Sequence, residues 1–343
     1  MSVRIGLVGY GLGGRIFHTP FIRAADNCEL VGVVTRDPDR VRQAMSDLPG
    51  ITVHASLSEL IASGVDAVVL STPLATRESL VLDAVARGVH VVVDKPFAPT
   101  AELGQEFADA AQRAGVVLSV FHNRRWDTDV VTLRRVLESG SIGRPWRFES
   151  RLDSHDPASL DPGPSGGLLR DLGSHLVDRA IVLMGPVRHV SAQVEGVDLG
   201  GGRTEAGFVV SLEHVDGANS HVSASRASHL VSRQMRVLGD AGSYESDFSD
   251  VQVDDVLAGR RPEGDRRGWG FEHAERWGRL STVDGVRTVP SAQGDYTLFY
   301  EAFARAITEG TPPPVLPSEA VAVLRVLDAA RTSALEHRTV TLG

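Results

Sequence analysis

Short apolar runs alternate with helical segments in the first third of the chain. The strand-like runs occupy residues 3–9, 28–36, 66–73, 89–98 and 116–123. Apolar residues between them follow helical spacing, most clearly at 77–88 and 100–115. Runs that are apolar at nearly every position are typical of strands buried on both faces of a parallel sheet. The pattern predicts an α/β domain over residues 1–122, with a doubly wound parallel sheet of the Rossmann type.

The periodicity changes from residue 145 onward. Alternating apolar and polar positions, typical of strands with one face toward water, occupy residues 145–153, 189–197, 205–214, 218–227, 232–246 and 284–291. They predict an α+β domain over residues 123–343 with a large, open, mostly antiparallel sheet. A helix at 167–180 falls between the first two strands. The last helix, at 317–336, is expected to pack beside the sheet or near the first domain.

Composition narrows the class of protein. The chain has 343 residues, 42% of them hydrophobic, which is enough for two domains with their own cores. Its net charge is −9, whereas a nucleic-acid partner favours a clustered basic excess. Cys28 is the single cysteine, and no apolar run approaches the ~20 residues of a membrane span. With a first strand that starts at residue 3, these features predict a cytoplasmic protein without nucleic-acid or membrane partners.

A glycine-rich turn follows the first strand. Residues 9–14 read G-x-G-x-x-G, and a helical stretch and a second strand come next, as in a dinucleotide-binding βαβ unit. Gly9 is expected to allow the tight turn, Gly11 the approach of a pyrophosphate, and Gly14 close helix packing, with Leu12 also at the cofactor. A glycine-rich turn without a ligand is the alternative, which explains the following strand less well.

The end of the second strand indicates which dinucleotide binds. An NAD site usually has an acid there for the ribose 2′-hydroxyl, about 20 residues past the glycines. Here Thr35 and Arg36 end the strand, and Arg40 lies one helical turn further. A hydroxyl and guanidinium groups suit a 2′-phosphate, so we expect NADP, with NAD also possible. The alternative gives the ribose to Asp37, although Asp37-Pro38 is typical of a helix start.

Residues that carry chemistry follow several of the parallel strands. Ligands bind at the carboxyl ends of such strands, where the sequence has Thr72, Pro73, Lys95, Pro96, His122 and Asn123. Lys95 is expected near the nicotinamide end of the cofactor, and a lysine that merely extends toward water is the alternative. Arg124, Arg125 and Trp126 are expected either to contact cofactor or substrate or to brace the turn between the domains.

The helix at 167–180 carries an unusual polar face. Asp171, His175 and Asp178 stand at i, i+4 and i+7, beside an apolar stripe of leucines. They predict either a solvated edge or a proton-handling site, in which Asp178 is structural and Gly173 lets a substrate approach. A metal site is not expected, because there are no cysteine ligands and no H-x-x-x-H motif.

The chain resembles the Gfo/Idh/MocA oxidoreductase family in three motifs: the glycine loop, the Asp94-Lys95-Pro96 turn and the segment 166–175. The family's usual turn is Glu-Lys-Pro, so Asp94 is a departure that keeps the lysine. Residues 9–22, 117–143, 266–282 and 299–303 are also similar to the branch of NADP-dependent scyllo-inositol dehydrogenases. The resemblance implies hydride transfer between a cyclitol or sugar hydroxyl and the nicotinamide, in a homodimer or homotetramer.

The resemblance implies catalytic roles for Lys95 and for the polar face of the helix at 167–180. His175 is expected to take the hydroxyl proton, Lys95 to stabilise the alkoxide, and Asp171 to orient His175 or bind a neighbouring hydroxyl. The alternatives are another sugar or polyol substrate, a dinucleotide-binding regulator without turnover, and a cleaving enzyme with a transient redox step. Two Pro- and Gly-rich loops, 154–167 and 258–270, are possible lids, and His155, Trp269 and Tyr296 are further candidates for substrate contact.

Overall fold

The computed structural model describes residues 2–160, 167–199 and 202–343, which form two units. Unit 1 consists of Met1–Asn123, Gln252–Trp269 and Asp295–Val321. Unit 2 consists of Arg124–Val251, Gly270–Gly294 and Ala322–Gly343. The expected division at residues 122 and 123 did not include the two later segments of unit 1. Among the described residues, no helix combines the length and apolar character needed to cross a membrane.

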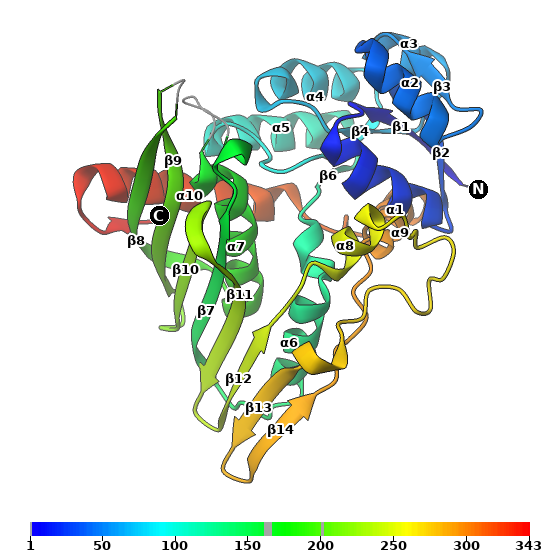
Figure 1. The fold of residues 1–343 in the computed structure, drawn as a ribbon. Coiled ribbons are helices and arrows are strands. Elements are labelled where there is room, and N and C mark those ends of the chain that lie inside the picture. Colours follow the sequence, from blue (N-terminus) through cyan, green and yellow to red (C-terminus); the bar gives the residue numbers. More distant parts are fainter. Residues whose placement is uncertain (1, 161–166, 200–201) are drawn as a thin grey trace. The chain divides into compact units, whose positions relative to one another are not determined.

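Unit 1 is built on a six-stranded parallel sheet (Figure 1). Its strands are β1 (Val3–Val8), β2 (Cys28–Val34), β3 (Thr52–His54), β4 (Ala67–Leu70), β5 (His90–Val93) and β6 (Leu118–Val120). They lie in the order β3-β2-β1-β4-β5-β6, the doubly wound arrangement that the sequence predicts. Residues 67–70 and 91–93 are fully buried, which explains their uninterrupted apolar runs.

Helices connect the strands of unit 1, and further helices of this unit come from its two later segments. They are α1 (Thr19–Ala24), α2 (Pro38–Asp47), α3 (Leu57–Ala62), α4 (Arg77–Ala86), α5 (Ala101–Ala114), α8 (Val251–Leu257), α9 (Thr297–Glu309) and the start of α10 (Pro317–Glu336). Helix α9 packs against α1, β1 and β2. Its Phe299 and Tyr300 contact Phe121 after β6, with ring centroids 4.9 and 5.6 Å apart. These aromatic contacts explain why the late segment belongs to unit 1.

The helix after the glycine loop begins differently from the regular helix that its spacing predicts. Gly13–His18 form a π-helical turn, η1, before α1 starts at Thr19. The Thr19 backbone N–H donates to the Gly14 carbonyl, five residues back, and the Thr19 hydroxyl donates to the same oxygen at 2.8 Å. Pro20 follows and has no N–H to continue the ladder, so the wide turn ends there.

Unit 2 contains a nine-stranded sheet. Its strands are β7 (Pro145–His155), β8 (Val187–Leu199), β9 (Gly202–His214), β10 (Asn219–Ser225), β11 (Ala227–Gly239), β12 (Gly242–Asp247), β13 (Gly278–Thr282), β14 (Gly285–Val289) and β15 (Val340–Thr341). The order is β14-β13-β12-β11-β7-β10-β9-β8-β15, and only the β7–β10 pair is parallel. The predicted open, mostly antiparallel sheet is therefore confirmed.

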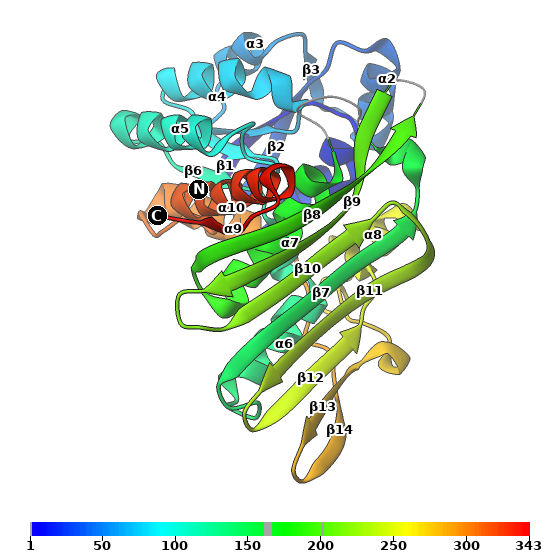
Figure 2. The ribbon, with the colours of Figure 1, turned by 90° about the vertical axis from the view of Figure 1, so that its left-hand side faces the viewer.

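One face of this sheet is covered and the other is not. Helix α7 (Leu168–Met184) packs on β7, β9 and β10. Figure 2 shows the opposite face of β7, β10 and β11 toward the viewer with no helix in front of it. Burial alternates along β10, and its inward Ser220, Val222 and Ala224 are buried. The period-two pattern in the sequence reflects this one-sided burial.

Candidate active site

The glycine loop of unit 1 lines a cavity of about 800 Å³ at the carboxyl ends of β1, β2 and β4. Many of the predicted cofactor residues line it, namely Gly9, Gly11, Leu12, Thr35, Arg36, Arg40, Thr72 and Pro73. Gly9 has a φ of 103°, and a Cβ there would lie 2.1 Å from the Ser71 carbonyl oxygen. A Cβ at Gly14 would lie 2.1 Å from the Gly9 carbonyl oxygen. The tight turn and the close helix contact therefore both require glycine.

Gly11 differs from Gly9 and Gly14, because a Cβ there would not clash with the backbone. The nearest atoms to a Cβ there are in the Arg40 guanidinium, at 3.8 Å, and the backbone is otherwise bare toward the cavity. A pyrophosphate needs such an approach to main-chain N–H groups and a nearby cation. The residues present therefore fit the diphosphate of a dinucleotide.

This geometry predicts separate effects for two glycine substitutions. Gly11→Ala changes the free energy of unfolding by less than about 0.5 kcal/mol, because its methyl group makes only an ordinary van der Waals contact with the Arg40 side chain at 3.8 Å. It raises the Kd for NADPH by about 10- to 100-fold, the loss expected when a charge-assisted hydrogen bond is blocked. Gly9→Ala instead lowers the free energy of unfolding by more than about 1 kcal/mol. Fluorescence titration and urea unfolding measure both quantities, and unchanged NADPH affinity in Gly11→Ala would contradict the assignment.

The far end of the same cavity carries the residues that predicted the 2′-phosphate. Arg36 and Arg40 line it, are exposed, and form no ion pair among the described residues. Asp37 caps α2, because its Oδ1 accepts from the N–H groups of Asp39 (2.9 Å) and Arg40 (3.1 Å). These backbone hydrogen bonds lower the pKa of the Asp37 carboxyl. Its Oδ1 is thus engaged at the helix start.

Arg77 holds the turn after β5 that carries the predicted catalytic lysine. It opens α4 and is 4% exposed. Its guanidinium donates to the carbonyl oxygens of Asp94 (2.6 Å), Pro96, Lys95 (3.3 Å) and Thr72 (3.3 Å). The Lys95–Pro96 peptide bond is cis. One buried cation thereby links the ends of β4 and β5, a role that the sequence reasoning missed because a single arginine in a helix gives no pattern.

The carboxyl group of Asp94 fixes the same turn from within. It accepts from the Ser71 hydroxyl at 3.0 Å and the Lys95 N–H at 2.8 Å, and His18 Nε2 lies 3.3 Å away. His18 is fully buried and shares a 2.5 Å hydrogen bond between its Nδ1 and the Tyr300 hydroxyl. Burial alone would raise the pKa of Asp94, but the charge and hydrogen bond of His18, with nearby cations, hold that pKa well below its usual range.

The polar face of α7 divides into three environments. Asp171 is exposed in the first turn, and His175 is 6% exposed. Asp178 is buried against Arg125, whose Nε donates to Oδ2 at 3.0 Å and whose Nη2 donates to Oδ1 at 2.7 Å. A Cβ at Gly173 would lie 3.2 Å from Leu327 and 3.5 Å from Phe208. Gly173 therefore permits core packing, and the expectation that it admits a substrate is wrong.

His175 lines a pocket of about 190 Å³ within unit 2. His175 and Arg179 come from successive turns of α7, and the other arginines that line it are Arg124, Arg226 and Arg233. Strands β7, β10 and β11, which are adjacent in the sheet, bring these residues to the helix. The sequence reasoning did not single out Arg179, Arg226 or Arg233.

Residues 122–127 are buried or half-buried in the structure. His122 and Asn123 are buried, and Trp126 is half-buried in the short helix η3 (Asn123–Trp126). Arg124 lines the His175 pocket, whereas Arg125 is bound to Asp178. This ion pair lies within unit 2, and the predicted cofactor contact of Arg125 stays a prediction.

The remaining substrate candidates lie elsewhere. His155 ends β7 and is exposed, with its ring stacked on His229 at 4.0 Å. Trp269 is 3% exposed and its Nε1 donates to Gln252, and Tyr296 is fully buried. These two aromatic residues are buried in unit 1, and their predicted substrate contact stays a prediction. Within the predicted lid 154–167, residues 161–166 fall outside the described ranges.

Two family descriptions match most of the sequence. "Oxidoreductase family, NAD-binding Rossmann fold" matches residues 3–122, and "Oxidoreductase family, C-terminal alpha/beta domain" matches residues 134–342. The chain belongs to the Gfo/Idh/MocA oxidoreductase family. As a member it is a dehydrogenase of CH–OH groups that uses a nicotinamide dinucleotide and a small-molecule substrate.

Named relatives of this Gfo/Idh/MocA protein include two inositol dehydrogenases. The scyllo-inositol 2-dehydrogenase (NADP(+)) IolW of Bacillus subtilis is 31% identical over 358 residues, which cover 99% of this chain and 96% of the relative. The myo-inositol 2-dehydrogenase of Thermotoga maritima is 27% identical and covers 99% and 98%. The solved structure of the B. subtilis oxidoreductase YvaA superposes with a TM-score of 0.91 at 30% identity, covering 100% of this chain and 98% of its own.

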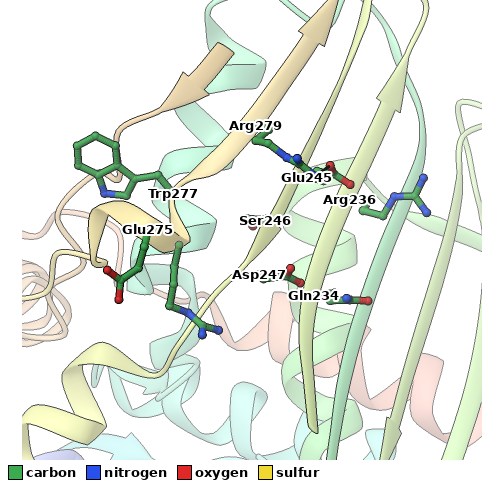
Figure 3. A pocket seen from close by; sticks show the side chains of 9 residues that line it. Gln234, Arg236, Glu245, Ser246, Asp247, Glu275, Trp277 and Arg279 are labelled. Carbon is green, nitrogen blue, oxygen red and sulfur yellow. Dashed lines mark hydrogen bonds and ion pairs between the residues drawn. The ribbon is translucent and has the colours of Figure 1, made fainter. Parts of the chain in front are cut away.

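The outer face of the sheet in this Gfo/Idh/MocA protein carries another hollow, of about 440 Å³, over β11 to β13. Figure 3 shows Glu245 and Arg279 extending toward each other from neighbouring strands, and their ion pair measures 2.5 Å. Arg236 in the same hollow pairs with Glu149 at 3.1 Å. No histidine, lysine or cysteine is among the residues that line this hollow.

The described ranges contain no cluster of side chains suited to bind a metal ion. Within residues 2–160, 167–199 and 202–343, no three His, Cys, Asp or Glu side chains gather in a way that could hold a metal ion.

Proposed function

We propose that this protein is an NADP-dependent dehydrogenase that transfers a hydride between a ring CH–OH group of a cyclitol or sugar and nicotinamide. Scyllo-inositol is the reference substrate, because the relative IolW is a scyllo-inositol 2-dehydrogenase that uses NADP(+). The dinucleotide cavity of unit 1 and the His175 pocket of unit 2 supply the cofactor and substrate functions. We further propose that the protein acts in the cytoplasm as a homodimer or homotetramer.

The observation that supports the choice of NADP is that the arginines and the aspartate at the end of β2 have different surroundings. Arg36 and Arg40 line the cavity, and neither has an ion-pair partner within 4 Å among the described residues. Asp37, the acid that would hold a ribose 2′-hydroxyl, already accepts two backbone N–H groups of its own helix. A 2′-phosphate suits two arginines, which bind phosphate oxygens through charge-assisted hydrogen bonds.

The proposed mechanism assigns one task to each side chain. Bound nicotinamide supplies the hydride acceptor. The His175 imidazole takes the hydroxyl proton while the C–H bond breaks with its electron pair, so the substrate loses one proton and one hydride and becomes a ketone. The Lys95 ammonium stabilises the negative charge that develops on the oxygen. Asp171 binds a neighbouring hydroxyl or orients His175.

Initial rates of NADP⁺ and NAD⁺ reduction test this proposal across inositol isomers and aldoses. We expect turnover with NADP⁺ to exceed turnover with NAD⁺. Arg36→Ala raises the KM for NADP⁺ by about 10- to 100-fold, the effect of one lost charged hydrogen-bond partner, and leaves the KM for NAD⁺ unchanged.

Arg42→Ala is the matched control, since Arg42 lies on α2, the helix that follows Arg36, pairs with Asp39 and is not among the residues that line the cavity. Equal effects of Arg36→Ala on both cofactors would contradict the NADP assignment. Tight NADPH binding without turnover of any compound would favour the regulator alternative.

A further inference from the structure

The His175 pocket has a composition that a neutral polyol does not require. Four arginines line it, Arg124, Arg179, Arg226 and Arg233, and Asp153 is the one carboxylate among its lining residues. Guanidinium groups are donors only, whereas each hydroxyl of a polyol both donates and accepts. A site built for hydroxyls alone is expected to offer acceptors as well. The excess of donors indicates a ligand that brings negative charge.

Three of these arginines form ion pairs with carboxylates that do not line the pocket. Arg124 pairs with Asp250 at 2.6 Å, Arg233 pairs with the same carboxylate at 3.3 Å, and Arg179 pairs with Asp127 at 2.7 Å. Neither carboxylate lines the pocket. Asp129 lies a further 3.7 Å from Arg179, and these three buried acids hold the three guanidinium groups in place.

Arg226 differs from the other three. Its Nη1 donates to the Ser154 hydroxyl at 2.9 Å, and it forms no ion pair with any carboxylate in the described ranges. Its Nε is buried and has no hydrogen-bond partner. A buried donor without an acceptor is costly. Arg226 is therefore a half-buried cation whose missing partner is an oxygen acceptor, and it lines the same pocket as His175.

The single lining carboxylate, Asp153, forms no ion pair with these four arginines in the described ranges. Asp153 has its nearest cation in Arg151, at 3.8 Å, and Arg151 does not line the pocket. Burial, with a smaller contribution from Glu195, raises the pKa of Asp153 and so disfavours its charged form. Arg226 is consequently the lining arginine that no carboxylate in the described ranges pairs with.

We infer that the substrate of this enzyme carries an anionic group, a carboxylate or a phosphate, which Arg226 and its neighbouring arginines bind while His175 acts on a hydroxyl of the same molecule. The inference rests on the proposed function for the reaction and narrows its substrate to sugar acids or sugar phosphates. The pocket volume of about 190 Å³ suits a small molecule, since drug-sized ligands occupy roughly 300–1,000 Å³.

Kinetics with the intact enzyme and NADP⁺ test this inference. The panel pairs neutral compounds (scyllo-inositol, myo-inositol, glucose) with carboxylates (gluconate, glucuronate) and a phosphate (glucose 6-phosphate). We expect kcat/KM to be higher for a charged compound than for its neutral counterpart, and the KM of the charged compound to rise with salt concentration. The two charged arms distinguish a carboxylate from a phosphate.

Variants at Arg226 locate the effect. Arg226→Gln lowers the charged-to-neutral ratio of kcat/KM by about 10- to 100-fold, and Arg226→Lys recovers part of it because the charge remains. Arg236→Gln, on the outer face of the sheet, is the matched control and leaves the ratio unchanged. If Arg226→Gln does not fold, Arg226→Lys and the salt dependence of the wild-type enzyme still decide.

Calorimetric binding of gluconate and glucose 6-phosphate separates failure of the inference from failure of the proposed function. Turnover of neutral compounds with a ratio that Arg226 variants do not change would overturn the inference and leave the proposed function standing. Anion binding that depends on Arg226, without any redox turnover, would support the inference and overturn the proposed reaction. Absence of both anion binding and turnover would overturn both.

Discussion

Replacement of His175 by glutamine is expected to lower kcat by about 10²- to 10⁴-fold, the contribution of a positioned general base. Glutamine keeps much of the size of the imidazole and its capacity to hydrogen-bond, but it cannot take up the hydroxyl proton. The dinucleotide cavity is lined by residues between Val8 and Leu80, whereas His175 belongs to unit 2. The Kd for NADPH should therefore remain unchanged, and stopped-flow hydride transfer together with fluorescence titration measures both quantities.

His214 supplies the control for this substitution. It is also a buried histidine of unit 2, with its Nδ1 at 2.7 Å from the Gly185 carbonyl oxygen and its Nε2 at 2.6 Å from the Ser220 hydroxyl. His214→Gln is expected to lower the melting temperature without lowering kcat per folded molecule. A His175→Gln enzyme that retains its turnover, or one that loses NADPH affinity, would show that His175 does not act as the base.

The parts of the fold that the sequence predicts well are those in which local pattern and burial coincide. Strands such as Val91–Val93 are apolar at every position because both faces of the parallel sheet are covered. The β10 alternation likewise reflects a sheet with one covered face. Strand β13 escaped prediction because Gly278–Thr282 has few apolar side chains and is held by backbone pairing to β12 and β14. The two-residue β15 is too short for any periodicity.

The candidate site was predictable only where its residues are close in sequence. The α7 spacing correctly placed Asp171, His175 and Asp178 on one face, but it could not show that Asp178 is consumed by an ion pair. Arg226 comes to the His175 pocket through the order β11-β7-β10, in which strands far apart in the chain are neighbours. Such non-local pairing leaves no signal in a single sequence.

The roles of two aromatic residues were also not predictable from the sequence. Trp269 and Tyr296 lie near Pro- and Gly-rich stretches, where an aromatic side chain can equally cover a ligand or close a core. The structure gives both to the core, with Phe21 ring centroids 6.0 Å from Trp269 and 5.0 Å from Tyr296. Burial decides between the two roles, and burial depends on the late segments that fold back onto unit 1.

Arg77→Met is expected to lower both the free energy of unfolding and kcat. Its guanidinium supplies donors to four carbonyl oxygens around the Lys95 turn, and a buried carbonyl left without a donor costs about 1–3 kcal/mol. We expect the free energy of unfolding to fall by about 2–4 kcal/mol, because water and the remaining backbone donors satisfy only some of these oxygens. Urea unfolding of the purified variant measures this loss.

The kinetic result distinguishes a positioning residue from a purely structural one. If Arg77 acts by holding Lys95, the folded fraction of Arg77→Met loses about 10²-fold in kcat, the scale of a misplaced catalytic group, while its KM for NADP⁺ changes little. Arg77→Lys should recover part of kcat, since a lysine can still reach one or two of the carbonyl oxygens. Arg87→Met is the control on the same helix, where an exposed pair with Asp83 predicts a change within about 1 kcal/mol. A destabilised Arg77→Met enzyme with full kcat per folded molecule would leave Arg77 a structural role and show that the Lys95 turn keeps its geometry without it.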